Sequence, residues 1–316
     1  MLSLTDRIKA KAMELGFSKV GIARAVVLEK EGKLLREWLS RDFHGTMEWM
    51  ERNVEKRIDV RKVLPDAQSA VVVAMNYYTE ASHSDEPDDG KISRYAWGDD
   101  YHDVMIPRLE KLLEFIKSEV PAVEGKVYAD TGPVMDKVWA VRAGVGWEGK
   151  HTNVISRDFG SWIFLGEIIL DIGLEYDEPS TDYCGTCTRC IDACPTDAIT
   201  EPYVLNSNLC ISYLTIEHKG EIPGAISSRF ENWIYGCDIC QDICPWNQRF
   251  SKPTQEAAFS PRKGFLSPSL VELASMSEEE FRERFQGSPV KRTKHSGLMR
   301  NVKAVLKNRE LVPERS

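Results

Sequence analysis

The residues best suited to chemistry in this 316-residue sequence are its eight cysteines, which all lie within 184–244. The first four are Cys184, Cys187, Cys190 and Cys194. Their spacing, C-x2-C-x2-C-x3-C followed by proline, is the run with which bacterial ferredoxins bind [4Fe–4S] clusters. In such a run the first three cysteines bind one cluster and the fourth binds the other. The spacing therefore predicts transfer of single electrons.

The remaining four cysteines complete a second set of ligands. Three of them have the spacing C-x2-C-x3-C before a proline, so one member of a full run is missing there. Cys210 is the only cysteine left over, and folding can bring its loop close. We therefore predict that one cluster is bound by Cys184, Cys187, Cys190 and Cys244, and the other by Cys194, Cys210, Cys237 and Cys240.

Two other uses of eight cysteines fit the sequence less well. Two zinc sites would use paired C-x2-C units and would not need the closely spaced third and fourth cysteines before proline. Disulfides are disfavoured in a reducing cytoplasm. We expect a cytoplasmic location because the N-terminal stretch 1–17 carries charges through an amphipathic helical pattern, unlike an export signal.

The stretch before the cysteines must position whatever the electrons are used for. Its apolar patterns predict strands over 19–23, 69–78 and 126–130 and an amphipathic helix over 103–120. The long apolar run 161–174 contains a central glycine, and its length favours bent strands over one helix. This alternation of helices and strands predicts a layered α/β or α+β domain.

Three regions differ in composition and predict the domain organisation. Residues 1–175 form the layered α/β domain, and 176–250 form a ferredoxin-like domain with two [4Fe–4S] clusters. Residues 251–316 form a mostly helical C-terminal segment, in which Ser277 and Glu280 have the spacing of a capping box at a helix start.

Charge is distributed unevenly along the chain. The net charge of −8 argues against a protein that simply coats nucleic acid. Residues 291–316, however, contain eight lysines and arginines against two glutamates, a local charge of +6. This tail predicts either a contact with a polyanion or a solvated helix face. No apolar run reaches membrane-spanning length, so we expect no membrane contact.

Two further motifs are incomplete. The stretch 144–149 has the letters G-x-G-x-x-G but follows a helix-like segment where a dinucleotide site needs a strand. The stretch 100–105 starts like a D-x-H cobalamin-binding motif but has Met105 where that motif needs glycine. The sequence therefore favours neither a dinucleotide site nor cobalamin bound through a histidine.

Several stretches together resemble the epoxyqueuosine reductase family. They are WGDDYHD (97–103), YADTGP (128–133), RAGVGWEGKHTNVIS (142–156), CGTCTRCIDACPTDAI (184–199), CISYLTIEHKG (210–220), YGCDICQDICPWN (235–247) and SGLMRN (296–301). The resemblance implies a cobalamin-binding N-terminal domain, two [4Fe–4S] clusters and a tRNA substrate. It implies reduction of the epoxide of epoxyqueuosine at the tRNA wobble position to the alkene, the last step of queuosine synthesis.

The resemblance also implies roles for individual residues. Asp130 is expected to be the proton donor, with a pKa raised by burial against the corrin, although an aspartate here also suits a helix cap near Pro133. The expected cobalamin contacts are Arg57, Ser93, Tyr101, His102, Asp130, Lys150, Val154, Leu165 and Ser212. The expected tRNA contacts are Lys291, Arg292, Lys294, Arg300 and Lys303.

The resemblance implies an external low-potential electron donor, and we expect a monomer. Three alternatives remain open at this point. The chain could be another cobalamin and iron–sulfur reductase, such as a reductive dehalogenase. It could be a non-catalytic electron-transfer module, which would bind no corrin. A zinc-stabilised RNA-binding protein would contain no iron.

Overall fold

A four-stranded antiparallel sheet organises the first half of the chain. In the computed structural model, which describes residues 2–310, its order is β1 (Lys19–Arg24), β2 (Ser69–Asn76), β7 (Ile163–Leu170) and β4 (Gly125–Tyr128). The central strands β2 and β7 pair along their whole length and are rich in valine and isoleucine. Such branched side chains suit strands that are covered on both faces.

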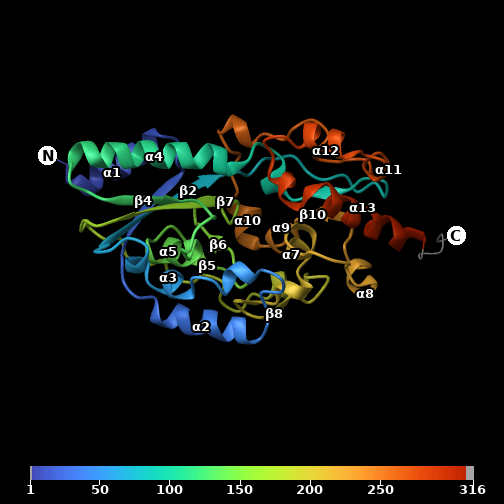
Figure 1. Ribbon diagram of the computed structural model, residues 1–316, viewed down its shortest axis with the longest axis horizontal. Helices are drawn as coiled ribbons and strands as arrows, with labels where there is room; N and C mark the ends of the chain where they lie inside the picture. Colours follow the sequence, from blue (N-terminus) through green and yellow to red (C-terminus); the bar gives the residue numbers. More distant parts are fainter. Residues whose placement is uncertain (1, 311–316) are drawn as a thin grey trace.

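Helices cover both faces of this sheet (Figure 1). α1 (Leu4–Glu14) and α4 (Tyr101–Glu119) pack on one face, and α5 (Asp136–Arg142) packs on the other. α2 (Glu29–Ser40) and α3 (Val54–Ile58) lie on the same side as α5. Because successive strand residues point to opposite faces, β2 and β7 contribute to two separate apolar cores, one beneath each helical layer.

The layer of α5 packs very close to the sheet. A Cβ at Gly21 in β1 would lie 1.9 Å from the carbonyl oxygen of Ala143, the residue that follows α5. Only glycine allows this approach. The end of α5 is thereby held against β1, and the helix also packs on β2 and β7.

The cysteines lie among short elements in the second half. α6 (Arg189–Asp192) and α9 (Ile239–Asp242) pack against each other, and each ends two residues before the last cysteine of its run. The other elements there are α7 (Ile211–Ile216), α8 (Gly224–Ser227), α10 (Pro245–Phe250), the hairpin β8 (Ile199–Glu201) and β9 (Val204–Leu205), and β10 (Trp233–Tyr235). Between the two halves, β5 (Trp147–Glu148) pairs with β6 (Val154–Ile155).

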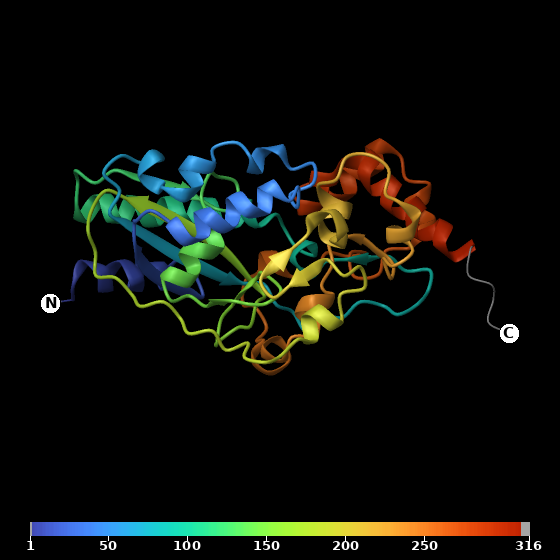
Figure 2. The same ribbon diagram turned by 90° about the horizontal axis from the view of Figure 1, so that it is seen from below.

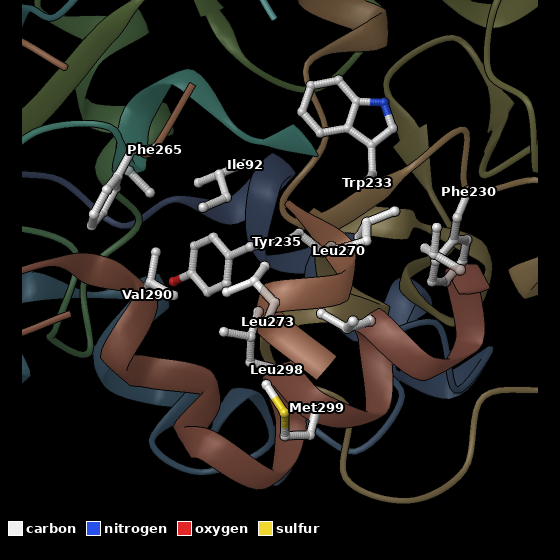
Figure 3. Close-up of a cluster of buried hydrophobic side chains, with 14 of the residues drawn as sticks. Ile92, Phe230, Trp233, Tyr235, Phe265, Leu270, Leu273, Val290, Leu298 and Met299 are labelled. Atoms are coloured by element: carbon white, nitrogen blue, oxygen red, sulfur yellow. The ribbon is translucent and has the colours of Figure 1, made fainter. Parts of the chain in front are cut away.

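The C-terminal helices share a third core with the cysteine region. This core joins side chains of α11 (Leu270–Ala274), α12 (Glu278–Arg284) and α13 (Lys294–Glu310) to those of β10 and of β3 (Lys91–Ile92), a short strand parallel to β10. Figure 3 shows Tyr235 and Leu298 among its buried members. Figure 2 shows that α13 lies at the end of the molecule opposite to α1.

The predicted elements are largely confirmed. The strands and the helix expected in the first half correspond to β1, β2, β4 and α4, and Ser277 and Glu280 form a capping box at α12. The run 161–174 contains one strand, β7, where bent strands were expected. The mixed α/β class is confirmed, and the sheet is antiparallel throughout. Within residues 2–310, no helix is both long and apolar enough to span a membrane.

Candidate redox active site

The first predicted ligand set surrounds a cavity. Its volume is about 240 Å³, and the residues around it include Cys184, Cys187, Cys190 and Cys244. Burial and the neighbouring thiols, Cys244 above all, raise the pKa of the Cys190 thiol to about 11. Cys244, which is 54 residues further along the chain than Cys190, therefore lies beside the first run, as the predicted set requires.

The second predicted set also comes together. Burial raises the pKa of the Cys240 thiol well above its usual range, and the charges of Cys210 and Cys194 add to this effect. Burial raises the pKa of the Cys237 thiol in the same way, and the charges of Cys240 and Cys210 raise it further. The displaced cysteine, Cys210, directly precedes α7, and its sulfur accepts backbone hydrogen bonds from Tyr213 and Ser212.

The geometry of these groups differs from that of a single-ion site. Within residues 2–310, no three Cys, His, Asp or Glu side chains gather closely enough to hold one metal ion. In a [4Fe–4S] cluster each cysteine binds a different iron atom, so the four ligands stand around a larger group. Two groups of four cysteines, one around a cavity, fit that larger group.

Two of the expected cobalamin contacts support the cysteine loops. The Lys150 ammonium donates hydrogen bonds to the carbonyl oxygens of Gly185 (2.6 Å) and Cys187 (3.0 Å). The buried Ser93 hydroxyl donates to the carboxylate of Asp238, which lies between two cysteines of the second set. Both side chains therefore have structural partners near the clusters, and a role in holding a corrin remains a prediction.

Asp130 lies in the loop that follows β4, at the edge of the same sheet. Its φ is +59°, a left-handed conformation that aspartate tolerates better than most residues. Its side chain is 64% exposed, so only a bound group could bury it. Asp130 does not cap α5, because that helix begins six residues later after Met135 and has no side-chain cap. Its carboxylate is therefore available for chemistry.

Arg57 holds the Asp130 loop in place. Its guanidinium donates hydrogen bonds to the carbonyl oxygens of Gly132 (3.2 Å), Val134 (3.5 Å) and Trp49 (3.4 Å). Burial lowers the pKa of Arg57 despite the nearby carboxylates of Asp136 and Asp130. Its Nε is buried without a partner among the described residues, which leaves one donor for a bound group.

The start of α4 places two aromatic side chains beside Asp130. His102 Nε2 lies 3.8 Å from Asp130 Oδ2, and His102 Nδ1 lies 2.7 Å from the carboxylate of Asp100, the N-cap of α4. Burial raises the pKa of the Tyr101 phenol, and the charge of Asp130 and a hydrogen bond with it raise it further. The Tyr101 ring stacks on His102 and on Phe164. Tyr101 and His102, which were predicted to line the cofactor pocket, therefore both lie beside Asp130.

Lys137, near the start of α5, lies within electrostatic reach of both the Asp130 loop and Cys240, and the region around it is called the recess below. Lys137 is exposed, yet the surrounding protein lowers the pKa of its ammonium, which also senses the charges of Asp130 and Cys240. Cys240 itself is only partly exposed and strongly desolvated. A redox cofactor placed in the recess would lie between the proton donor and the second set of cysteines.

A buried carboxyl pair behind Asp130 was missed by the sequence analysis. Glu167 in β7 is fully buried, and neither of its carboxylate oxygens has a hydrogen-bond partner among the described residues. Burial raises its pKa well above the usual range, and the adjacent Asp136 raises it further. The pKa of Asp136 itself is raised to about 6, mainly by burial. The signal was one charged residue inside the apolar run 161–174.

The remaining expected cobalamin contacts lie on the α5 side or near the second cysteine group. Val154 in β6 is buried, and Leu165 in β7 packs against the same core as Val154. Ser212 is half-buried in the first turn of α7 and donates its backbone N–H to Cys210. The contacts of these three residues with a cofactor remain predictions.

The C-terminal cations differ in how far the protein itself uses them. Arg300 donates hydrogen bonds to the carbonyl oxygens of Leu214, His218 and Gly220. Arg292 pairs with Glu217, and Lys291 lies 3.4 Å from Asp100. Lys294 and Lys303 are exposed. Of the five expected tRNA contacts, these two lysines have the greatest freedom to meet phosphates.

Comparisons with known families agree along the chain. A family model described as "Epoxyqueuosine reductase QueG, DUF1730" matches residues 57–131, and one described as "4Fe-4S double cluster binding domain" matches residues 183–247. An epoxyqueuosine reductase of Cellulophaga algicola is 47% identical over 94% of this chain and 96% of its own. That of Escherichia coli is 42% identical over 96% of this chain and 81% of its own.

Solved structures show the same similarity. An epoxyqueuosine reductase crystallised with an epoxyqueuosine-modified tyrosine tRNA stem loop has a TM-score of 0.90 and 32% identity, over 96% of this chain and 81% of its own. The Bacillus subtilis enzyme, in a form whose catalytic aspartate loop is swung out of the active site, has a TM-score of 0.89 and 31% identity, over the same shares of the two chains.

Proposed function

The chain belongs to the epoxyqueuosine reductase family, and we propose that it reduces the epoxide of epoxyqueuosine in tRNA to the alkene of queuosine. The proposal places the substrate at the wobble position and the reaction last in queuosine synthesis. One observation carries it furthest: the charges of Asp130 and Cys240 both act on Lys137. A proposed proton donor and a proposed cluster ligand therefore both lie near Lys137, and reduction with loss of oxygen needs a proton and electrons at one place.

The eight cysteines are proposed to bind two [4Fe–4S] clusters in the two sets described above. The match of residues 183–247 to a double-cluster domain supports two clusters. The grouping of the thiols supports this division of ligands. Because the first cluster's cavity lies beside the partly exposed Cys184 and Cys187, we propose that an external low-potential donor delivers electrons there.

Cobalamin is proposed as the second cofactor, and when bound it would pass electrons from the clusters to the epoxide. The residues around Lys137 are compatible with such a group because Lys137 and Asp130 are exposed and Cys240 of the second cysteine set lies nearby. Unpartnered buried nitrogens of Arg57 and His102 are near it. We propose that it is held by Arg57, Ser93, Tyr101, His102, Lys150, Val154, Leu165 and Ser212.

Asp130 is proposed to donate the proton that the leaving epoxide oxygen needs. The oxygen of a breaking C–O bond carries negative charge, and a carboxylic acid within reach removes it by proton transfer. The Asp130 carboxyl is exposed to the recess and is held by the Arg57-bound loop. The Bacillus subtilis neighbour is described as having a catalytic aspartate loop, which supports the same role here.

The experiment that tests the function is anaerobic purification, addition of cobalamin and an assay with tRNA that carries epoxyqueuosine. We expect about eight irons per chain, a retained corrin and conversion of epoxyqueuosine to queuosine. Iron without retained corrin would instead support an electron-transfer module. Retained corrin without conversion would contradict the proposed substrate.

We propose that the exposed lysines of α13 bind tRNA phosphates. Lys303→Ala is expected to weaken binding of the modified stem loop without changing the rate at saturating RNA. The dependence of log affinity on log salt should become shallower by roughly 0.7–0.9, since one phosphate contact is lost.

The control for Lys303→Ala is Lys117→Ala, which removes a lysine from the last turn of α4. This variant should leave the salt dependence unchanged. Equal slopes for Lys303→Ala and the wild type, measured by fluorescence anisotropy, would exclude Lys303 as a phosphate contact.

We expect the enzyme to act as a cytoplasmic monomer.

A further inference from the structure

Reduction of an epoxide to an alkene and water consumes two electrons and two protons, and Asp130 alone carries one proton. We propose that His102, held by Asp100, supplies the second proton by reprotonating Asp130 during the reaction. This inference rests on the proposed function and on the role of Asp130 in it. It assigns to His102 a positioning and proton-supply role through Asp130, distinct from contact with a cofactor.

The geometry around His102 is that of an oriented imidazole. Asp100 Oδ1 lies 2.7 Å from Nδ1 and also accepts the backbone N–H of His102, so one carboxylate fixes the ring and places a proton on Nδ1. The ring stacks on Tyr101 with 4.1 Å between centroids. These contacts leave Nε2 as the only ring nitrogen free to exchange a proton.

Nε2 is directed toward Asp130. It lies 3.8 Å from Asp130 Oδ2, and within residues 2–310 it is buried without a hydrogen-bond partner. A buried nitrogen without a hydrogen-bond partner lowers the stability of the fold, so its presence in a native structure calls for an explanation such as a catalytic role. Catalytic hydrogen bonds are often long before substrate binds, and a small rotation of the exposed Asp130 side chain would shorten this distance.

The charges around His102 favour its protonated form. Burial lowers the pKa of His102, but the hydrogen bond and charge of Asp100 and the charges of Asp130 and Asp103 raise it more, so the net pKa is above its usual range. From the C-terminal segment, Lys291 lies 3.4 Å from the other oxygen of Asp100 and partly offsets that carboxylate. The imidazolium form, in which Nε2 carries a proton to give, therefore persists to a higher pH than in an ordinary histidine.

The proton transfers balance with the electrons. The Asp130 carboxyl protonates the epoxide oxygen as the first C–O bond breaks, which gives a hydroxyl group. His102 Nε2 then gives its proton to the Asp130 carboxylate. The restored carboxyl protonates the hydroxyl as the second C–O bond breaks, which releases water and leaves the alkene. Two electrons come from the reduced clusters, and the His102 ring, whose side chain is 30% exposed, regains its proton between turnovers.

The test compares single-turnover rates of the wild type and His102→Gln, both reconstituted with clusters and saturated with corrin. The wild-type rate should fall as pH rises through the His102 pKa, because the imidazolium is the form that donates. His102→Gln should be about 10- to 100-fold slower at neutral pH and should lose this descending limb. Asp100→Asn should lower the pH at which the limb begins, since it removes the charge that raises the pKa.

Two further variants separate proton supply from structure. Added imidazole should restore part of the rate of His102→Ala, which a purely structural defect would not allow. His218→Gln is the matched control, since the side chain of that histidine makes a surface hydrogen bond to the carbonyl oxygen of Glu221 and packs on Tyr213, away from Asp130, and the variant should keep the wild-type rate and profile.

Three outcomes would overturn the inference. An unchanged rate and pH profile in His102→Gln would remove His102 from proton supply while leaving the proposed function intact. If the corrin-bound fraction of His102→Gln kept the wild-type rate and descending limb, and only corrin occupancy fell, the residue would act by holding the cofactor alone. A wild-type enzyme that binds corrin but makes no queuosine would overturn both the proposed function and this inference.

Discussion

Asp130→Asn is expected to lower the single-turnover rate of queuosine formation by about 10²- to 10⁴-fold, the range over which a positioned acid contributes to catalysis. The amide cannot give a proton to the leaving oxygen. Asparagine tolerates the left-handed backbone at this position, so the loop held by Arg57 should keep its shape. Iron content, corrin absorbance and tRNA affinity should therefore match the wild type.

The control for Asp130→Asn is Asp66→Asn. Asp66 is also an exposed aspartate with a positive φ, of 61°, so it tests the same substitution in the same backbone conformation away from the recess. Its rate should equal that of the wild type. If Asp130→Asn turned over at the wild-type rate, Asp130 would not be the acid, and His102 or a bound water would have to protonate the oxygen directly.

The elements of the first half could be predicted because their patterns are local. The valine-rich β2 and the amphipathic α4 depend on side-chain periodicity over ten or twenty residues. The antiparallel order of the sheet could not be read in this way, since it depends on which strands meet after folding. The class was therefore predictable, whereas the neighbour relations of β7 were not.

The site was predictable residue by residue but not as an arrangement. The sequence and the family resemblance singled out Asp130 and His102, yet nothing in their spacing shows that the start of α4 packs beside the loop after β4. The burial of Glu167 was not predicted, because a single charged residue in an apolar run is usually placed at the end of a strand, where solvent reaches it. Its burial beside Asp136 depends on the close packing of α5, which a glycine in β1 allows.

The basic tail shows why charge counts predict surfaces poorly. Eight cations against two glutamates predicted either a contact with a polyanion or a solvated helix face. Arg300, however, uses its guanidinium to hold the backbone after α7, and Arg292 is paired with Glu217. Sequence alone cannot separate cations that stabilise the fold from those that remain available to a ligand, because the difference lies in partners far away in the chain.

Single cysteine replacements are expected to remove one cluster each and to abolish turnover, because electrons would no longer pass from the donor to the recess. Cys244→Ala should reduce the iron content from about eight to about four per chain, as should Cys190→Ala, although the two residues are far apart in sequence. Cys210→Ala should also leave about four irons. In this variant the second cluster is lost and the first, bound by Cys184, Cys187, Cys190 and Cys244, remains. Iron analysis and electron paramagnetic resonance of the reduced protein measure both effects.

Double replacements test the exchange of ligands between the two cysteine runs. Cys190 and Cys244 lie around one cavity, so replacing both with alanine should still leave about four irons per chain. Cys194 follows Cys190 in the same run but lies with Cys240 and Cys210, so the pair Cys194 and Cys244 should leave none. If each run instead held its own cluster, the pair Cys190 and Cys194 would leave half the iron, and the predicted exchange would be wrong.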